Sequence, residues 1–496
     1  MDPHKRRKVT GMISFANKSL RDHIYACWLG KNIGGTMGTP YEGRREMLDI
    51  QGFSTAPGVV LPNDDLDLQL VWLMACEQNG PYQLNSHVLA EYWLGYISPN
   101  WNEYGIGKSN LRLGLLPPLS GDYRNDWKDS NGAWIRTEVW ACMAPGCPDV
   151  AIRYSCEDAS VDHGMAEGTY AAIFVAAVEA SAFVEKDLRR LIEIGLSKIP
   201  ADCRVARSVK LVCDCYDKGI DWRKTRERVV ADSADLGWFE APANVAYVIL
   251  GLLYGEGDFK KSMIYAIDCG DDTDCTGATI GSIMGIIGGI DFIPKDWQQY
   301  IGDSIVTVSV DKGCLSGVPK TCTELTDRVM RQIPAMLLAN GANVNICAEA
   351  DGCDAADRAR LAGGAVAADL CARPSRSFDM DFLYFRARVI FDEDPSVAPG
   401  GAVPMRIQFD QRLYGTGPRH LQLRWILPEG WSIEGGRQEV YLPHSRPSRS
   451  AEPRNASTIS FTVRAGERVD FQNRLILEIT CVNHVMPALI PVTILG

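Results

Sequence analysis

Two patterns of hydrophobic and polar positions divide the chain. Up to about residue 344, apolar residues recur every three to four positions, which is typical of helices that bury one face. After residue 378, apolar and polar residues alternate in short runs separated by turn residues, as on the strands of an antiparallel sheet. The pattern predicts an all-α region followed by a small antiparallel β-sandwich.

The helical region contains a series of expected helices and one long irregular stretch. Residues 98–130 are rich in glycine, proline, asparagine and aromatic residues, which favours a functional loop over a plain connector. Strand patterns are nearly absent before residue 340. Helices are expected at residues 20–38, 67–78, 87–96, 134–142, 149–158, 163–183, 186–197, 203–218, 222–231, 240–254, 258–268, 276–288 and 324–340.

These patterns divide the chain into four expected parts. Residues 1–18 are expected to form a polar tail, and residues 19–344 the all-α domain. Residues 345–378 mix alanine, aspartate, glycine and cysteine without clear periodicity, which indicates a linker or a partly ordered insert. Residues 379–496 are expected to form an Ig-like accessory sandwich. Its strands are expected at residues 382–391, 403–409, 421–426, 438–442, 458–463 and 474–479.

Two expected helices carry a glycine at every fourth position. Each glycine costs a helix about 1 kcal/mol relative to alanine. We infer that the two helices cross at short range, which would bring Glu42 near the acidic residues that precede the second helix. The alternative is that both are buried helices that merely tolerate glycine. The two ladders are Gly30, Gly34 and Gly38, and Gly277, Gly281 and Gly285.

Composition and charge exclude several classes of protein. The chain has 496 residues, of which 46% are hydrophobic and 23% charged, as in an ordinary soluble globular protein with two or more domains. The net charge of -11 argues against a general nucleic-acid or anionic-membrane surface. The most apolar helix candidate, residues 277–290, is shorter than the roughly 20 residues that span a bilayer. We therefore expect it in the core.

The cysteines and the N-terminal residues indicate a cytoplasmic protein. The 16 cysteines include no Cys-x-x-Cys pair, so we expect reduced, mostly buried thiols rather than a zinc ribbon or a thioredoxin-type site. The first residues lack the apolar segment of a signal peptide. The basic run at residues 5–8 is expected to be a solvated tail, with a nuclear address as the alternative. The oligomeric state is left open.

A first acidic cluster lies where a loop becomes a helix. The segment Asn63-Asp64-Asp65-Leu66-Asp67 places three carboxylates within four positions. Such crowding is unfavourable unless a cation holds the carboxylates together, and hard divalent cations prefer oxygen ligands. The alternative is helix capping, because asparagine and aspartate are favoured at helix starts.

A second acidic cluster, residues 268–274, precedes the apolar helix. Asp272 and Asp274 lie on the same side of an extended segment, and burying them without a metal would be costly. A calcium EF-hand is excluded, because Thr273 stands where its glycine is required and Thr279 where its glutamate is required. No phosphate loop, His-Glu-x-x-His or Gly-x-Ser-x-Gly motif occurs. We infer that the two acidic clusters meet and share metal ions.

With these motifs in order, the chain resembles the ADP-ribosylglycohydrolase family of the dinitrogenase reductase-activating type. The resemblance covers roughly residues 20–340. The two aspartate motifs are its most specific part. The matching segments are Gly30 to Glu42, Asn63-Asp64-Asp65, Asn131-Gly-Ala-Trp-Ile-Arg136, Asp162-His163-Gly164 and Gly270-Asp271-Asp272-Thr273-Asp274.

The resemblance implies an orthogonal all-α bundle with two Mg²⁺ (or Mn²⁺) ions. In the family these ions hold ribose hydroxyls and a water that hydrolyses a glycosidic bond. Glu42 and Asp65 are the implied catalytic residues. The implied metal ligands are Asn63, Asp64, Asp65, Asp272, Asp274 and Thr276. The implied substrate-binding residues are Asn131, Gly132, Arg136, His163 and Asp271, and for Arg136 and His163 a structural ion pair or helix cap is the alternative.

The chain departs from the family pattern at four positions. Cys275 replaces a hydroxyl residue that often helps to bind the second metal, and sulfur is a poor ligand for magnesium. Thr276 carries a hydroxyl one position late. Asn63 stands where a threonine is usual, and Asp67 adds a negative charge. These departures bear on the substrate more than on the metal site.

The leading hypothesis is a dimetal glycoside hydrolase that cleaves an N- or O-glycosidic bond to a ribose-like furanose. ADP-ribose conjugates, either small molecules or protein-linked, are the expected substrates. One alternative is a hydrolase of another furanoside or nucleoside-like glycoside. Another is a non-catalytic protein that binds ADP-ribose or a glycan. Two bound divalent ions would favour an enzyme, and one ion or none would favour the binding protein.

Overall fold

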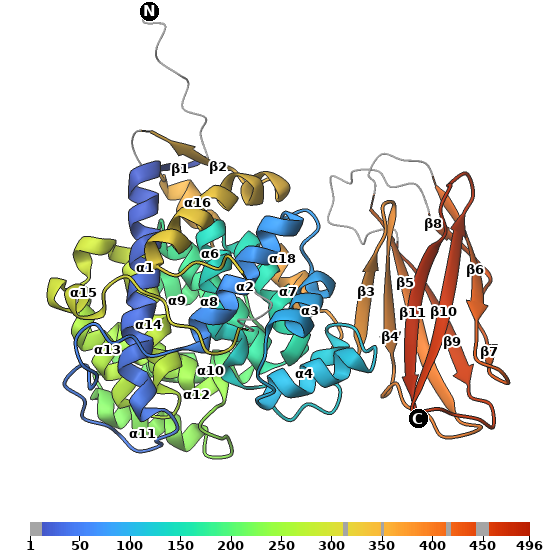
Figure 1. The fold of residues 1–496 in the computed structure, drawn as a ribbon, viewed down its shortest axis with the longest axis horizontal. Coiled ribbons are helices and arrows are strands. Elements are labelled where there is room, and N and C mark those ends of the chain that lie inside the picture. Colours follow the sequence, from blue (N-terminus) through green and yellow to red (C-terminus); the bar gives the residue numbers. More distant parts are fainter. Residues whose placement is uncertain (1–11, 311–315, 349–351, 413–417, 443–455) are drawn as a thin grey trace, which may run out of the picture. The chain divides into compact units, whose positions relative to one another are not determined.

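The computed structural model describes residues 12–310, 316–348, 352–412, 418–442 and 456–496. The chain divides into two compact units, one of residues 1–105 with 126–372 and the other of residues 106–125 with 373–496. The first unit is mainly helical and the second is built mainly of strands (Figure 1). The expected helical bundle followed by a β-sandwich is confirmed.

Most helices of the first unit lie close to their expected positions. They are α1 (Asn17–Gly38), α2 (Asp64–Asn79), α3 (Ser86–Tyr96), α6 (Glu138–Met143), α7 (Pro148–His163), α8 (Glu167–Ala182), α9 (Leu188–Leu196), α10 (Arg204–Asp217), α11 (Trp222–Asp232), α12 (Ala241–Tyr254), α13 (Phe259–Asp268), α14 (Thr273–Gly288) and α16 (Cys322–Ala339). Helix α15 (Lys295–Ile301) and the 3-10 turns η1 (Thr39–Tyr41), η2 (Asn131–Arg136) and η3 (Ile290–Phe292) were not expected. Helices α8 and α12 are buried along nearly their whole length, because their alanine- and valine-rich sequences lack a polar face.

Helices α1 and α14 cross at the two glycine ladders. A methyl group added at Gly30 would overlap the backbone of Gly281, and one at Gly34 would overlap that of Gly277. The inferred close crossing is confirmed, and it requires glycine because the backbones touch. Beyond the crossing, the Gly43 N–H donates to the carbonyl of Asp271 at 2.9 Å. The chain that follows α1 therefore runs beside the acidic segment that precedes α14.

The expectation of a loop over residues 98–130 is wrong. This stretch contains α4 (Asn102–Arg112) and the short α5 (Leu119–Asp122). Glu103 and Tyr104 on α4 are only 1% and 2% exposed. Their burial stabilises a helix whose glycine-containing sequence has weak intrinsic propensity, so tertiary packing overrides the local composition.

The expected tail and insert are also partly ordered. Strand β1 (Ile13–Ala16) pairs in parallel with β2 (Val344–Cys347). The insert further contains α17 (Ala355–Arg360), which begins with a capping box, and α18 (Ala365–Cys371). The helical unit thus carries a two-stranded sheet made by segments from its opposite ends, which no local pattern predicts. The basic run at residues 5–8 lies outside the described residues.

The second unit consists of two antiparallel sheets. Their strand orders are β11-β10-β6-β8 and β3-β4-β5-β9-β7. Alternate residues are buried along the longer strands, as the period-two pattern predicts. Strands β3, β7 and β11 were not expected. The strands are β3 (Ser377–Asp381), β4 (Phe385–Phe391), β5 (Ala402–Gln411), β6 (Arg419–Ile426), β7 (Ser432–Glu434), β8 (Glu439–Leu442), β9 (Ala456–Arg464), β10 (Gln472–Cys481) and β11 (Ala488–Leu495).

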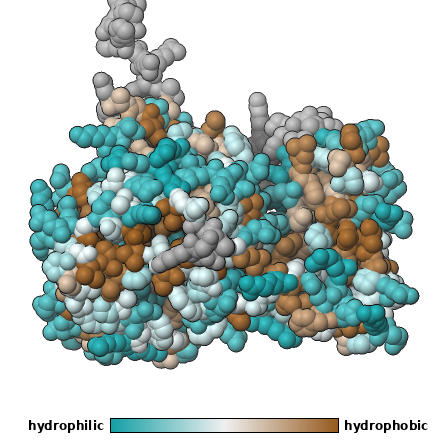
Figure 2. All heavy atoms as spheres, viewed as in Figure 1, coloured by the Kyte–Doolittle hydropathy of each residue, from teal (hydrophilic) through white to brown (hydrophobic). Residues whose placement is uncertain are grey.

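One face of the molecule is mixed in polarity. Hydrophilic residues cover much of the face shown in Figure 2, with apolar patches between them. Within the part of the chain that the structure describes, no helix is long and apolar enough to cross a membrane. No described cysteine is in a disulfide and most are buried, as expected for core residues; their reduced state stays a prediction.

Candidate metal centre

The candidate site lies where the start of α2 meets the segment that precedes α14. One ligand atom each from Asp65, Asp274 and Cys275 lies within 4.8 Å of the other two. One carboxylate oxygen each from Glu42, Asp272 and Asp274 forms a second group within the same distance. Asp274 belongs to both groups, so acidic segments that are far apart in the sequence share one site.

Local backbone features set these side chains at helix starts. Asn63 Oδ1 accepts a hydrogen bond from the Asp65 backbone N–H at 2.7 Å, so Asn63 caps α2. Asp64 and Asp65 occupy the first turn, where the positive end of the helix dipole favours carboxylates. At the other segment, Asp271 has a φ of 61° and Asp272 directly precedes α14. Asn63 is therefore a helix cap, and its role as a metal ligand stays a prediction.

Neighbouring side chains hold two of the carboxylates in place. Tyr104 Oη donates to Asp64 Oδ2 at 2.8 Å, and Asn131 Nδ2 donates to Asp272 Oδ2 at 2.7 Å. The Asp272 backbone N–H donates to Asn244 Oδ1 at 3.1 Å. Asn131, expected to bind substrate, thus contacts an expected metal ligand. Tyr104 and Asn244 were not anticipated, because nothing in their local sequence points to a partner in the acidic segments.

Within the two ligand groups, two buried carboxylate oxygens have no hydrogen-bond partner among the described residues, namely Asp65 Oδ2 and Asp274 Oδ1. Asp65 is 1% exposed and Asp274 is 6% exposed. Burying a carboxylate without a partner is unfavourable, and carboxylate oxygens are preferred ligands of hard divalent cations. The donor set therefore fits divalent cations, with the sulfur of Cys275 as its one soft donor.

Burial and crowding raise the pKa of the five carboxyls in this site. Burial, followed by the charges of Asp274 and Asp64, raises the pKa of Glu42 to about 8. Burial and the charge of Asp274 raise the pKa of Asp64 to about 6. Burial and neighbouring carboxylates also hold the pKa of Asp65 and Asp272 well above the usual range, and burial raises that of Asp274. A bound cation would allow these groups to ionise together.

A buried lysine that the sequence analysis did not single out supports α2 beside the site. Lys31 on α1 is 1% exposed, and its Nζ donates to Glu138 Oε1 at 2.7 Å and to the Ile135 carbonyl at 2.8 Å. Gln69 Nε2 donates to Glu138 Oε2 at 2.8 Å and to the Asp65 carbonyl at 2.9 Å. The sequence places this single lysine in an apolar, glycine-rich helix. Buried lysines need an anionic partner, so an ion pair at Lys31 was predictable, although its partner was not.

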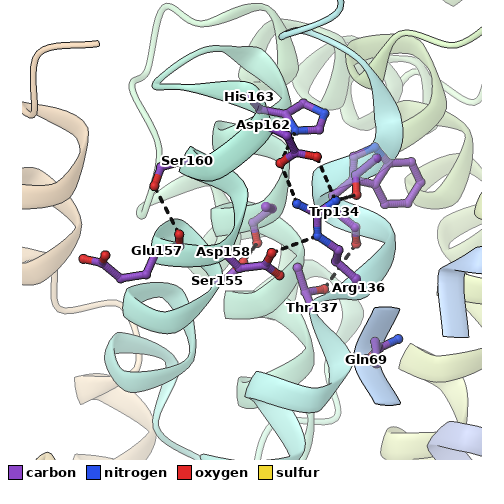
Figure 3. A network of polar contacts seen from close by, with 12 residues as sticks. Gln69, Trp134, Arg136, Thr137, Ser155, Glu157, Asp158, Ser160, Asp162 and His163 are labelled. Carbon is purple, nitrogen blue, oxygen red and sulfur yellow. Dashed lines mark hydrogen bonds and ion pairs between the residues drawn. The ribbon is translucent and has the colours of Figure 1, made fainter. Parts of the chain in front are cut away.

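Arg136, expected to bind substrate, lies in a buried ionic network (Figure 3). Its Nε donates to Asp158 Oδ1 at 3.0 Å and its Nη2 to Asp162 Oδ1 at 2.7 Å. The guanidinium also donates to the Gly132 carbonyl and lies over the ring of Trp93, 5.0 Å from its centroid. Because Arg136 is fully buried, the geometry favours a structural ion pair over contact with a substrate.

His163 belongs to the same network. Its Nδ1 lies 3.0 Å from Asp162 Oδ1 and its Nε2 lies 3.1 Å from Ser130 Oγ. Burial raises the pKa of Asp162, but the charges of Arg136 and His163 outweigh it and hold that pKa below its usual value. Burial raises the pKa of Asp158 to about 7 against the opposing charge of Arg136. The geometry favours the structural alternative for His163 as well.

Thr276 and Asp271 already have partners within the protein. The Thr276 hydroxyl donates to the Thr273 carbonyl at 3.2 Å. Asp271 Oδ1 accepts from Arg45 Nε at 3.2 Å, and its Oδ2 accepts from Tyr247 Oη at 3.4 Å. The roles of Thr276 as a metal ligand and of Asp271 in substrate binding stay predictions.

Asp67 and Gly132 contact groups outside the two ligand sets. Asp67 Oδ2 accepts from the backbone N–H groups of Val308 and of Ser309, the latter at 2.6 Å. The extra acidic residue therefore anchors the chain at residues 308–309. At Gly132, a side chain would overlap the carboxylate of Glu103. Glycine at this position leaves room for the buried Glu103 carboxylate, and the role of Gly132 in substrate binding stays a prediction.

Three comparisons relate the chain to known proteins. The family model for ADP-ribosylglycohydrolase matches residues 16–336. Human ADP-ribosylhydrolase ARH3 is 27% identical over 115 residues, which cover 22% of this chain and 30% of that protein. A solved structure titled ADP-ribosylglycohydrolase-related protein complex is 18% identical, covers 65% of this chain and 99% of its own, and has a TM-score of 0.42. The structure of a FixG-related protein from Vibrio parahaemolyticus is 10% identical, covers 23% of this chain and 97% of its own, and has a TM-score of 0.19.

Proposed function

This chain belongs to the ADP-ribosylglycohydrolase family, and on that premise we propose that it is a glycoside hydrolase dependent on two divalent metal ions, Mg²⁺ or Mn²⁺. Its substrates are conjugates in which a ribose-like furanose is joined to a leaving group through an N- or O-glycosidic bond. ADP-ribose conjugates, small or protein-linked, are the first candidates.

The observation that carries the proposal is the convergence of two acidic segments with unpartnered, buried oxygens. Asp65, Asp274 and Cys275 would hold one ion, and Glu42, Asp272 and Asp274 the other. Asp65 Oδ2 and Asp274 Oδ1, which have no hydrogen-bond partner among the described residues, are available to a cation. Hydrogen bonds from Tyr104 and Asn131 orient the carboxylates before any ligand binds, which lowers the cost of assembling the site.

The reaction is the addition of water across the glycosidic bond. When bound, the ions supply positive charge that orients ribose hydroxyls, activates water and offsets charge that develops on oxygen. The bond between the anomeric carbon and the leaving group breaks, the carbon gains a hydroxyl, and the leaving group gains a proton.

Glu42 is suited to handle that proton. It is exposed at the edge of the site, whereas Asp65 and Asp272 are 1% exposed. In the metal-free site, burial and the charges of Asp274 and Asp64 raise its pKa to about 8; bound ions would offset those charges, and the ionised carboxyl would then accept a proton from the attacking water. The turn that carries Asp65 is held by Gln69, which donates to the Asp65 carbonyl and to Glu138, the carboxylate that Lys31 also contacts.

The experiment measures product release by the full-length chain supplied with Mg²⁺ or Mn²⁺. ADP-ribosyl-arginine, ADP-ribosyl-serine peptides and simple furanosides are offered in parallel, and products are identified by mass spectrometry. Release of ADP-ribose is the expected result. Hydrolysis of the furanosides alone would replace the proposed substrate class, and binding without hydrolysis of any substrate would contradict an enzymatic role.

Matched variants test the assignment of the site. Asp65→Asn and Asp272→Asn should each reduce hydrolysis by more than the roughly 10–100-fold that loss of an outer hydrogen-bond partner costs. Asp67→Asn is the control, because Asp67 lies in the same helix turn but accepts from Val308 and Ser309. Full activity in the first two variants would overturn the proposed mechanism.

A further inference from the structure

The sulfur of Cys275 lies among the carboxylates of the candidate metal centre. Cys275 is in the first turn of α14 and is 4% exposed. Its Sγ lies 3.5 Å from Asp65 Oδ1, and Sγ, one oxygen of Asp65 and one oxygen of Asp274 all lie within 4.8 Å of one another. A thiol at this position changes the chemistry that the site offers to a cation.

The spacing of these atoms is compatible with one ion between them. Zinc–sulfur bonds of about 2.3 Å and zinc–oxygen bonds of about 2.0–2.2 Å place the ligands of one ion roughly 3.5–4.4 Å apart. Small side-chain rotations would bring the three ligand atoms, which lie within 4.8 Å of one another, into this range. Asp65 Oδ2 and Asp274 Oδ1 independently indicate a ligand, because they are buried without a hydrogen-bond partner among the described residues.

The neighbouring group of ligands has a different character. Glu42, Asp272 and Asp274 present carboxylate oxygens only. Oxygen donors suit hard cations such as Mg²⁺ and Mn²⁺, whereas thiolate donors select softer transition metals. The two groups share Asp274 and therefore offer adjoining positions with unequal donors.

We propose that the two ion positions are selective for different metals. The position of Asp65, Asp274 and Cys275 takes a thiophilic divalent ion such as Zn²⁺, Fe²⁺ or Co²⁺. The position of Glu42, Asp272 and Asp274 takes Mg²⁺ or Mn²⁺. The inference rests on the proposed function, because it concerns the same site, and it replaces the expectation of two like ions with a mixed pair.

The competing interpretation is that Cys275 only donates a weak hydrogen bond to Asp65. In that case the thiol would stay protonated and both positions would take the same hard ion. The two interpretations differ in whether a metal–sulfur bond forms, with the S–H bond broken and its proton released to solvent, which spectroscopy detects without any substrate.

The test uses Co²⁺ as the probe on the metal-free, full-length chain. The expected result is a sulfur-to-cobalt charge-transfer band in the near ultraviolet that saturates at one Co²⁺ per chain. Zn²⁺ should displace this Co²⁺, and excess Mg²⁺ should not. X-ray absorption at the cobalt edge of the unmodified chain should show one sulfur neighbour. Absence of both the band and the sulfur neighbour would overturn the proposal.

Two cysteine variants make the assignment specific. Cys275→Ser should abolish the band and lower the preference for Zn²⁺ over Mg²⁺ at least about tenfold, because a hydroxyl replaces the soft donor. Cys76→Ser is the matched control, since Cys76 is another buried cysteine and its Sγ lies 4.0 Å from Gln332 Oε1, an amide oxygen. A band that persists in Cys275→Ser would overturn the proposal, and its persistence in Cys76→Ser supports it.

The outcome is independent of hydrolysis. A sulfur-bound Co²⁺ in a chain that hydrolyses none of the offered substrates would support this inference and contradict the proposed function. Hydrolysis with Mg²⁺ alone, together with no sulfur-bound Co²⁺, would contradict this inference and leave the proposed function standing.

Discussion

Two clusters of charged residues in the helical unit, buried except for the exposed Glu42 and the half-buried Asp64, differ in how their negative charge is compensated. The acidic cluster has buried carboxylate oxygens without partners among the described residues, whereas the carboxylates of the arginine cluster receive hydrogen bonds from a guanidinium. Residue type alone therefore does not distinguish a binding site from a structural ion network. The acidic cluster is Glu42, Asp64, Asp65, Asp272 and Asp274, and the arginine cluster is Arg136, Asp158, Asp162 and His163.

The pKa directions follow the same division, with one instructive exception. Asp65 and Asp272 have pKa values well above the usual range, because burial and other carboxylates both disfavour their charge. Asp162 has a lowered pKa, because Arg136 and His163 overcome its burial. Asp158 is the exception, since burial raises its pKa to about 7 despite Arg136. One arginine therefore compensates one of its two aspartates more completely than the other.

The largest effect is expected from breaking the arginine cluster. Arg136→Met should lower the free energy of unfolding of the helical unit by about 3–5 kcal/mol, because it leaves two buried carboxyls without their cation. Urea unfolding followed by circular dichroism measures the change. Adding Asp158→Asn and Asp162→Asn should recover part of the loss. A loss below about 1 kcal/mol for Arg136→Met would show that the cluster is not a structural ion network.

Neutralising one carboxyl of the acidic cluster should raise the free energy of unfolding instead of lowering it. In the metal-free chain, Asp272→Asn should raise the free energy of unfolding, because burial and the neighbouring carboxylates both disfavour the ionised side chain. The amide keeps the shape of the side chain and removes its buried charge. The same denaturation experiment in a chelator measures the gain. The matched Asp162→Asn variant should be destabilised, and stabilisation of both would erase the distinction between the clusters.

The pH dependence of stability should also separate the clusters. The folded-state pKa of Glu42 is raised from 4.5 to about 8 and that of Asp64 from 3.8 to about 6. The folded chain therefore holds these protons more tightly than the unfolded chain, so the stability of the metal-free protein falls as pH rises from about 4 through 8. The melting temperature against pH, with chelator and with saturating Mn²⁺, measures this fall.

Bound ions should remove only the part of the pH dependence that belongs to the acidic cluster. The fall that remains in saturating Mn²⁺ should include Asp158, whose raised pKa of about 7 lies in the arginine cluster. The difference between the two curves isolates the carboxyls that contact the ions. Identical curves with and without Mn²⁺ would contradict a metal site at the acidic cluster.

The smallest expected effect concerns a single hydrogen bond. Tyr104→Phe removes the donor to Asp64 Oδ2 and should weaken Mn²⁺ binding by about 0.5–1.5 kcal/mol, or at most roughly tenfold. Isothermal titration measures the affinity. Ser130→Ala is the matched control, because its hydroxyl contacts His163 in the arginine cluster. Equal losses of affinity in both variants would argue against a local effect of Tyr104.

Features in which neighbouring residues carry an energetic cost that the fold must offset were predictable from the sequence. Crowded aspartates require a cation or a cap, and glycines repeated along a helix require a close neighbour, so both acidic segments and the crossing of α1 with α14 were expected. Features stabilised by distant contacts were not. Helix α4 depends on the burial of Glu103 and Tyr104, and β1 depends on β2 from the far end of the unit.

The partners of the charged residues could not be predicted from the neighbouring sequence. Nothing in the sequence around Arg136 or His163 distinguishes a contact with substrate from a contact with Asp162, and the folded chain favours the latter. Lys31 carried a signal, an unexplained charge in an apolar helix, but its partner Glu138 is more than a hundred residues away.

The amino-acid order was therefore sufficient for the helical and strand regions, the glycine crossing and the chemical groups available to a metal. The fold was needed to show which carboxylates meet a protein cation and which meet only each other, and that the sulfur of Cys275 lies beside Asp65 and Asp274. The physical reason is that secondary structure and helix capping depend on neighbouring residues. Compensation of buried charge instead depends on distances of a few ångströms between segments that are far apart in the chain.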